Sequence, residues 1–117
     1  MDMDNVELLL FVKTIEIINY IATADYPTLE EGGYLKEVTK NDIVSAIEDY
    51  EGVVSLVDEK YIGRFRFVLC KKKNKFITFA DLIIDNKISD LTLICEMTIS
   101  DNLNTIESAI IEDLHVL

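Results

Sequence analysis

The sequence predicts an α+β fold, with two main N-terminal helices packed on a curved antiparallel meander sheet of about four to five strands. Apolar residues recur at helical spacing before residue 52 and tend to alternate after it. Short polar segments separate the alternating runs, as in hairpin-connected strands. A length of 117 residues fits one hydrophobic core. We therefore expect one domain over 1–117, with a helical half at 1–52 and a sheet half at 53–117.

The first helix is expected over 4–24. Asp4 and Glu7 fit a capping pair, with acidic side chains at the positive end of the helix. Asp25 to Pro27 should end the helix, because the residue before a proline is pushed out of the α region. The apolar stripe is wide enough to suggest a helix laid across a sheet, and it contains Leu8, Leu9, Leu10, Phe11, Val12, Ile15, Ile17, Ile18, Ile21 and Ala22.

A short helical turn is expected at 27–31, closed by Gly32 and Gly33. The second main helix should run over 40–50, with Thr39 as its N-cap and Asp42 three residues later. Gly52 suits the left-handed position just past its end. The inner stripe consists of Ile43, Ala46, Ile47 and Tyr50, and the outer face carries Asp42, Glu48 and Asp49.

The second half reads as a meander of strands. A strand at 64–69 should place Phe65, Phe67 and Leu69 in the core, and the polar tip at 71–74 follows it. The run 75–84 is apolar on both faces, which predicts a central strand covered on each side. The run 90–99 alternates most cleanly. The last segment, 105–117, suits either a helix or a strand, and we favour a strand because a short turn after a strong strand continues the meander.

Charge is distributed unevenly along the chain, which carries a net charge of −11. This balance argues against a general nucleic-acid binder and against docking on an anionic membrane. Residues 60–75 are the exception, with seven basic residues and no acidic one. We interpret this stretch as a solvated hairpin with buried aromatic residues. The alternatives are a nucleic-acid contact or docking against an acidic surface, including the protein's own surface in a dimer.

The excess acidic residues have two interpretations. The simpler one is solubility, and the functional one is electrostatic complementarity to a basic partner, which accelerates association. The candidate partner-binding residues surround the second helix and its exit, and they are Glu30, Glu31, Asp42, Glu48, Asp49, Glu51, Asp58 and Glu59.

A second candidate group is a polar cluster on the predicted strands, made of Asp81, Asp90, Asp113 and His115. Asp81 shares strand parity with Ile77, Phe79 and Ile83, so we expect it to point into an apolar face. If the last two strands pair, Asp90 should approach His115. We favour structural hydrogen bonding for this cluster over ligand binding, and both over acid–base catalysis.

Motifs for catalysis and cofactors are missing from the sequence. A single histidine and two cysteines, Cys70 and Cys95, lack the spacing of a zinc site. Gly32 and Gly33 fit no phosphate-binding pattern. We expect no cofactor, no metal and no enzymatic activity. The cysteines should be reduced thiols packed as small hydrophobic groups in a cytoplasmic protein, with a disulfide between neighbouring strands as the alternative.

Several stretches resemble a family of small bacterial domains. They are 24–33, from Ala-Asp-Tyr-Pro to Gly-Gly, then 39–50, Ser-Asp-Leu-Thr-Leu at 89–93 and Glu-Asp-Leu-His-Val-Leu at 112–117. Domains of this kind are similar to immunity proteins of contact-dependent growth inhibition. The resemblance implies binding and neutralisation of a cognate toxin domain, with no direct nucleic-acid or membrane contact. It also supports a strand at the C-terminus.

The implied mechanism is steric and electrostatic occlusion of a basic nuclease, by a monomer or a weak homodimer. The alternative function is a small-ligand-binding domain, with the polar cluster lying between the helices and the sheet.

Overall fold

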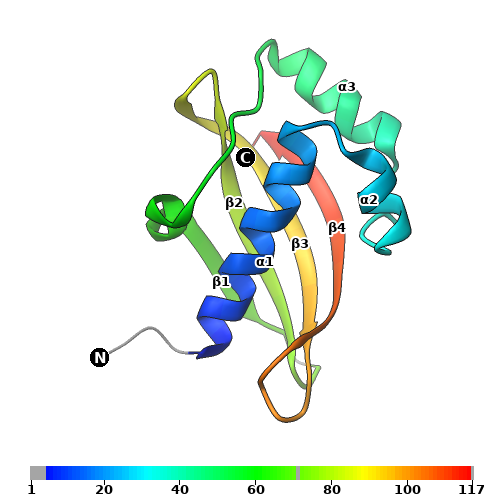
Figure 1. The fold of residues 1–117 in the computed structure, drawn as a ribbon, viewed down its shortest axis with the longest axis vertical. Helices are drawn as coiled ribbons and strands as arrows, with labels where there is room; N and C mark the ends of the chain where they lie inside the picture. Colours follow the sequence, from blue (N-terminus) through cyan, green and yellow to red (C-terminus); the bar gives the residue numbers. More distant parts are fainter. Residues whose placement is uncertain (1–4, 71, 117) are drawn as a thin grey trace.

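The computed structural model describes residues 5–70 and 72–116 and confirms the α+β class (Figure 1). The sheet has four antiparallel strands in the order β1-β2-β3-β4, so the meander is confirmed. The predicted capping residue Asp4, Lys71 of the hairpin tip and Leu117 lie outside the described residues. The elements are α1 (Asn5–Ala22), α2 (Tyr26–Glu31), α3 (Lys40–Tyr50), the 3₁₀ helix η1 (Glu59–Arg64), β1 (Phe65–Leu69), β2 (Lys75–Ile84), β3 (Lys87–Ile99) and β4 (Ile106–Val116).

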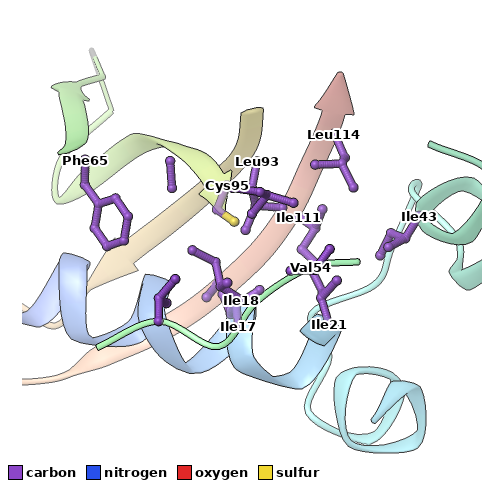
Figure 2. Packing of buried hydrophobic residues seen from close by; sticks show 14 of the residues in the cluster. Ile17, Ile18, Ile21, Ile43, Val54, Phe65, Leu93, Cys95, Ile111 and Leu114 are labelled. Carbon is purple, nitrogen blue, oxygen red and sulfur yellow. The ribbon is translucent and has the colours of Figure 1, made fainter. Parts of the chain in front are cut away.

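The core lies between α1 and one face of the sheet. Ile17 and Ile18 of α1 face Leu93 and Cys95 of β3 (Figure 2), and all four side chains are fully or almost fully buried. This packing explains the wide apolar stripe of α1, because the helix crosses the strands and contacts β2, β3 and β4.

The opposite face of the sheet is open along residues 75–81 of β2, which corrects the prediction that the run 75–84 is covered on both sides; only its last three residues, Leu82, Ile83 and Ile84, are all buried. Thr78 and Ala80 point towards α1 and are buried, whereas Ile77, Phe79 and Asp81 alternate with them and are only partly buried. The apolar side chains on this face are partly buried by side chains of the neighbouring strands β1 and β3. Apolarity on both faces of β2 therefore reflects its central position in the sheet.

The helix ends follow their capping residues. Asp25 is the N-cap of α2, and Thr39 and Asp42 form a complete capping box at the start of α3. The prediction for Gly52 is wrong, because the left-handed residue at the end of α3 is Glu51, with φ of 63°. Gly52 is required for space: a Cβ atom there would lie 2.2 Å from Cγ2 of Ile84.

The last segment is a strand, as expected. Leu93 pairs with Leu114 and Met97 with Ala109; one register shift lies between these two pairs, at Ile94/Cys95, and a second lies beyond them, at Thr98/Ile99. The first strand departs from its prediction at its C-terminal end. Phe65 is buried at 7% exposure, but Leu69, on the same side of the strand, is 67% exposed.

Candidate functional site

The C-terminal end of α3 collects negative charge. Ile43 anchors the helix in the core, and Glu48, Asp49 and Glu51 at its end are exposed. The last turn of α3 has no basic residue. Carboxylates are unfavourable there, because the C-terminus of a helix carries partial negative charge. Glu51 adds a second local cost, because a residue with a Cβ is disfavoured in the left-handed region.

Two hydrogen bonds bring further carboxylates to the same end of the molecule. The Tyr50 hydroxyl donates to Oδ1 of Asp90 at 2.9 Å, which ties α3 to β3. The backbone N–H of Val53 donates to Oδ1 of Asp85 at 3.0 Å. We call this surface the acidic end, and it consists of Glu48, Asp49, Glu51, Asp85 and Asp90.

Apolar groups and shallow clefts lie among these carboxylates. Val53, Ile88 and Val116 are 70%, 46% and 51% exposed. A cleft of about 260 Å³ separates α3 from the ends of β3 and β4, and another of about 360 Å³ lies between α3 and the β2–β3 turn; Tyr50 lines both. Exposed apolar side chains rimmed by charge are typical of protein-binding surfaces.

The other predicted acidic residues do not join the acidic end. Asp42 accepts a hydrogen bond from the backbone N–H of Thr39 at 2.8 Å, so it stabilises the start of α3. Asp58 caps η1, which packs against β1 at the other edge of the sheet. Glu59 lies exposed in η1, and Glu30 and Glu31 lie exposed at the end of α2.

The predicted polar cluster divides into three sets of contacts. Asp90 accepts a hydrogen bond from the Tyr50 hydroxyl. Thr92 is the residue in register with His115, and Asp90 lies two residues before it on β3, so the approach of Asp90 to His115 stays a prediction. The partner of His115 is Asp113, with Nδ1 and Oδ2 at 2.7 Å.

Asp81 lies on the open face, as its parity with Ile77 and Phe79 predicted, but it is paired there. Its Oδ1 accepts a hydrogen bond from Oγ1 of Thr92 at 2.8 Å, and Arg66 lies 3.6 Å from its Oδ2. The Arg66 guanidinium also stacks over the Phe79 ring at 5.8 Å. These contacts support the structural interpretation of Asp81.

Sequence reasoning missed a carboxyl pair on the open face. Hydrogen bonding to Glu112 and an ion pair with Lys75 lower the pKa of Glu96. Hydrogen bonding to Glu96 and burial raise the pKa of Glu112. A register shift in β4 separates the pairs Ile94–Asp113 and Cys95–Ile111, which leaves Glu112 between them. No pattern in the sequence located this shift.

The thiols are free, as expected, and Cys95 is buried. Burial raises the pKa of the Cys95 thiol to about 12, which suppresses the reactive thiolate. Within residues 5–70 and 72–116, no three His, Cys, Asp or Glu side chains are grouped to hold a metal ion. None of the helices described has the length and apolarity to cross a membrane.

The geometry thus defines a small α+β domain with a charged surface at one end of its sheet. The chain belongs to the family described as a domain of unknown function (DUF7668), which matches residues 18–117. No curated protein and no solved structure matches the chain.

Proposed function

We propose that this protein is an immunity protein that binds a basic toxin domain and neutralises it by steric and electrostatic occlusion. The proposal rests on one observation at the C-terminal end of α3. Glu48 and Asp49 place negative charge where the helix dipole is also negative, and the last turn contains no basic residue. Folding gains nothing from carboxylates at this position. Local features that cost stability concentrate at functional sites.

The surroundings of α3 support a macromolecular partner. Exposed Ile88 and Val116 supply apolar contact area, and Asp85 and Asp90 extend the negative field. A partner with lysine and arginine residues around an active site would be attracted by this field. A nuclease is such a partner, because its substrate is a polyanion.

The alternative of a small-ligand-binding domain receives less support. The cleft that His115 lines has a volume of about 260 Å³. This is below the range of roughly 300–1,000 Å³ that is usual for ligand sites. In addition, Asp81 lies on the face away from α1, so the polar cluster is not enclosed between helices and sheet.

The test is co-production with the product of the neighbouring reading frame. If the proposal is right, that product contains a basic domain that arrests growth, and this protein restores growth and forms an equimolar complex with it. The variant Asp49→Lys should weaken the complex, most strongly at low salt. Glu107→Lys is the matched control, because Glu107 is exposed on β4 and the change in charge is the same.

Asp42 should not be altered in this test, because its reversal also breaks the capping box, at a cost of about 1 kcal/mol. Absence of any toxic basic neighbour that binds, or turnover of a small molecule by the purified protein, would overturn the proposal.

A further inference from the structure

β1 is the first strand in the sheet order, and within residues 5–70 and 72–116 no strand pairs with its outer edge. The N–H of Cys70 donates to the carbonyl of Lys75 at 2.8 Å. Since hydrogen-bonded pairs alternate in an antiparallel ladder, the N–H groups of Val68 and Arg66 also face β2. The N–H groups of Phe67 and Leu69 therefore point away from the sheet, towards the free edge.

Apolar side chains follow this edge on the side of α1. Phe67 and Leu69 are 36% and 67% exposed. Phe11 of α1 packs edge-to-face on Phe67, with ring centroids 5.8 Å apart, so α1 passes over β1 (Figure 1). Leu8 and Val12 lie on the flank of α1 beyond Phe11 and are 43% and 49% exposed. Part of the apolar stripe of α1 is therefore not covered by the sheet.

The two edges of the sheet are protected differently. On β4, the N–H of Ile111 donates to the carbonyl of Tyr34 at 2.8 Å, and register shifts interrupt the pairing with β3. Capping and bulges of this kind prevent an edge from recruiting further strands. On β1, the pairing with β2 runs without a register shift from Phe65 to Leu69.

The basic residues near this edge of β1 determine which side chains a strand added there should carry. Arg66 lies on the open face of β1, where it pairs with Asp81 and is still about half exposed; Arg64 precedes the strand, and Lys72 and Lys73 follow it, with Lys73 3.5 Å from Asp101. An added strand would place alternate side chains next to Phe67 and Leu69 and the others next to Arg66. The first set should be apolar, and the second should be acidic. A second copy of this chain is disfavoured, because pairing of two β1 strands would bring the two basic stretches together.

We propose that the free edge of β1 binds an extended segment of a partner protein, with alternating apolar and acidic residues, as a fifth strand. The apolar residues would be covered by Leu8 and Val12 of α1. This surface is separate from the acidic end and has the opposite charge. The inference therefore does not depend on the proposed function.

The test is binding of a synthetic peptide with alternating valine and glutamate, measured by fluorescence anisotropy with the intact protein. We expect saturable binding that weakens with salt, with shifts of the Phe67 and Leu69 amide signals in NMR spectra. The same peptide with lysine in place of glutamate, or with N-methyl groups on its pairing edge, should bind about tenfold more weakly or not at all.

Two variants test the site. Leu69→Pro removes an N–H that faces the free edge, and Leu8→Glu removes an apolar contact on α1; each should weaken peptide binding about tenfold. Leu56→Glu is the control for Leu8→Glu, because Leu56 is 63% exposed outside this edge. Equal binding of the lysine peptide, insensitivity to both folded variants, or formation of a homodimer through β1 would overturn the proposal.

Discussion

Replacing Glu48 and Asp49 with lysine should stabilise the fold and weaken the binding of a basic partner. Both residues are exposed at the end of α3, where negative charge opposes the helix dipole. Lysine at the same positions would interact favourably with that dipole. It would also make the net charge of the chain less negative than its present value of −11. A surface that serves only solubility would not combine these two effects.

The magnitude follows from the exposed position of both residues. A charge near a helix end contributes about 0.3–1 kcal/mol, so the double variant should gain about 1 kcal/mol in free energy of unfolding. For a chain of 117 residues, an unfolding entropy of about 2.1 cal/mol/K per residue converts this gain into a rise in Tm of about 4 °C. The association rate with the toxin domain should fall about tenfold or more at low salt.

Thermal unfolding by circular dichroism at several salt concentrations measures the first effect, and stopped-flow fluorescence with the toxin domain measures the second. Glu107→Lys separates the helix-end effect from the change in net charge, because Glu107 lies on β4. A double variant that is less stable than the parent, or that binds with an unchanged, salt-independent rate, would refute the reasoning.

Three further predictions concern the interior and the open face. Thr78→Val should raise the free energy of unfolding by about 1 kcal/mol in urea titrations, because the buried Oγ1 of Thr78 faces the thiol of Cys95, which is only a weak hydrogen-bonding group; a loss of stability would mean that the thiol satisfies this hydroxyl. In the native protein, a thiol reagent should modify Cys70, which is partly exposed, and should reach Cys95 only on unfolding; equal rates would contradict this. Because the pKa of Glu112 is raised in the fold, its stabilising contribution is present below its ordinary value of 4.5 and is lost as the pH rises through the folded pKa. Glu112→Gln should therefore gain stability relative to the parent as the pH rises from 4 to 7, and a gain that stays constant with pH would contradict a raised pKa of Glu112 in the fold.

Much of the fold was predictable because local and tertiary preferences agree. The capping box of Thr39 and Asp42 and the alternation of β3 needed no long-range information. The end of α3 was less predictable. Both Glu51 and Gly52 follow the helix, and Gly52 was the expected left-handed residue. Glycine is needed at position 52 because the side chain of Ile84, 32 residues further along the chain, leaves no space for a Cβ atom.

The candidate surfaces depended on information that the sequence does not carry. Exposure along β1 rises from Phe65 to Leu69 because α1 covers only part of the strand. The alternation of apolar residues in β1 does not show how many of them α1 covers. The Glu96–Glu112 pair required the register shift in β4. The helical pattern of 40–50 predicted correctly that Glu48 and Asp49 are exposed, but it could not separate them from Asp42, which has a structural role.

The effect of an acidic residue on the stability of the fold depends on which end of a helix carries it. Acidic residues at the start of α3 are stabilising, and Asp42 is explained by folding alone. The same charge at the other end of the same helix is destabilising, and nothing in the described contacts of Glu48 or Asp49 compensates for it. Solubility accounts for exposed acidic residues in general, and α2 also ends in two of them, Glu30 and Glu31, with no basic residue in its last turn. A cationic partner would remove this cost on binding, which is why the proposed function places its binding surface at the end of α3.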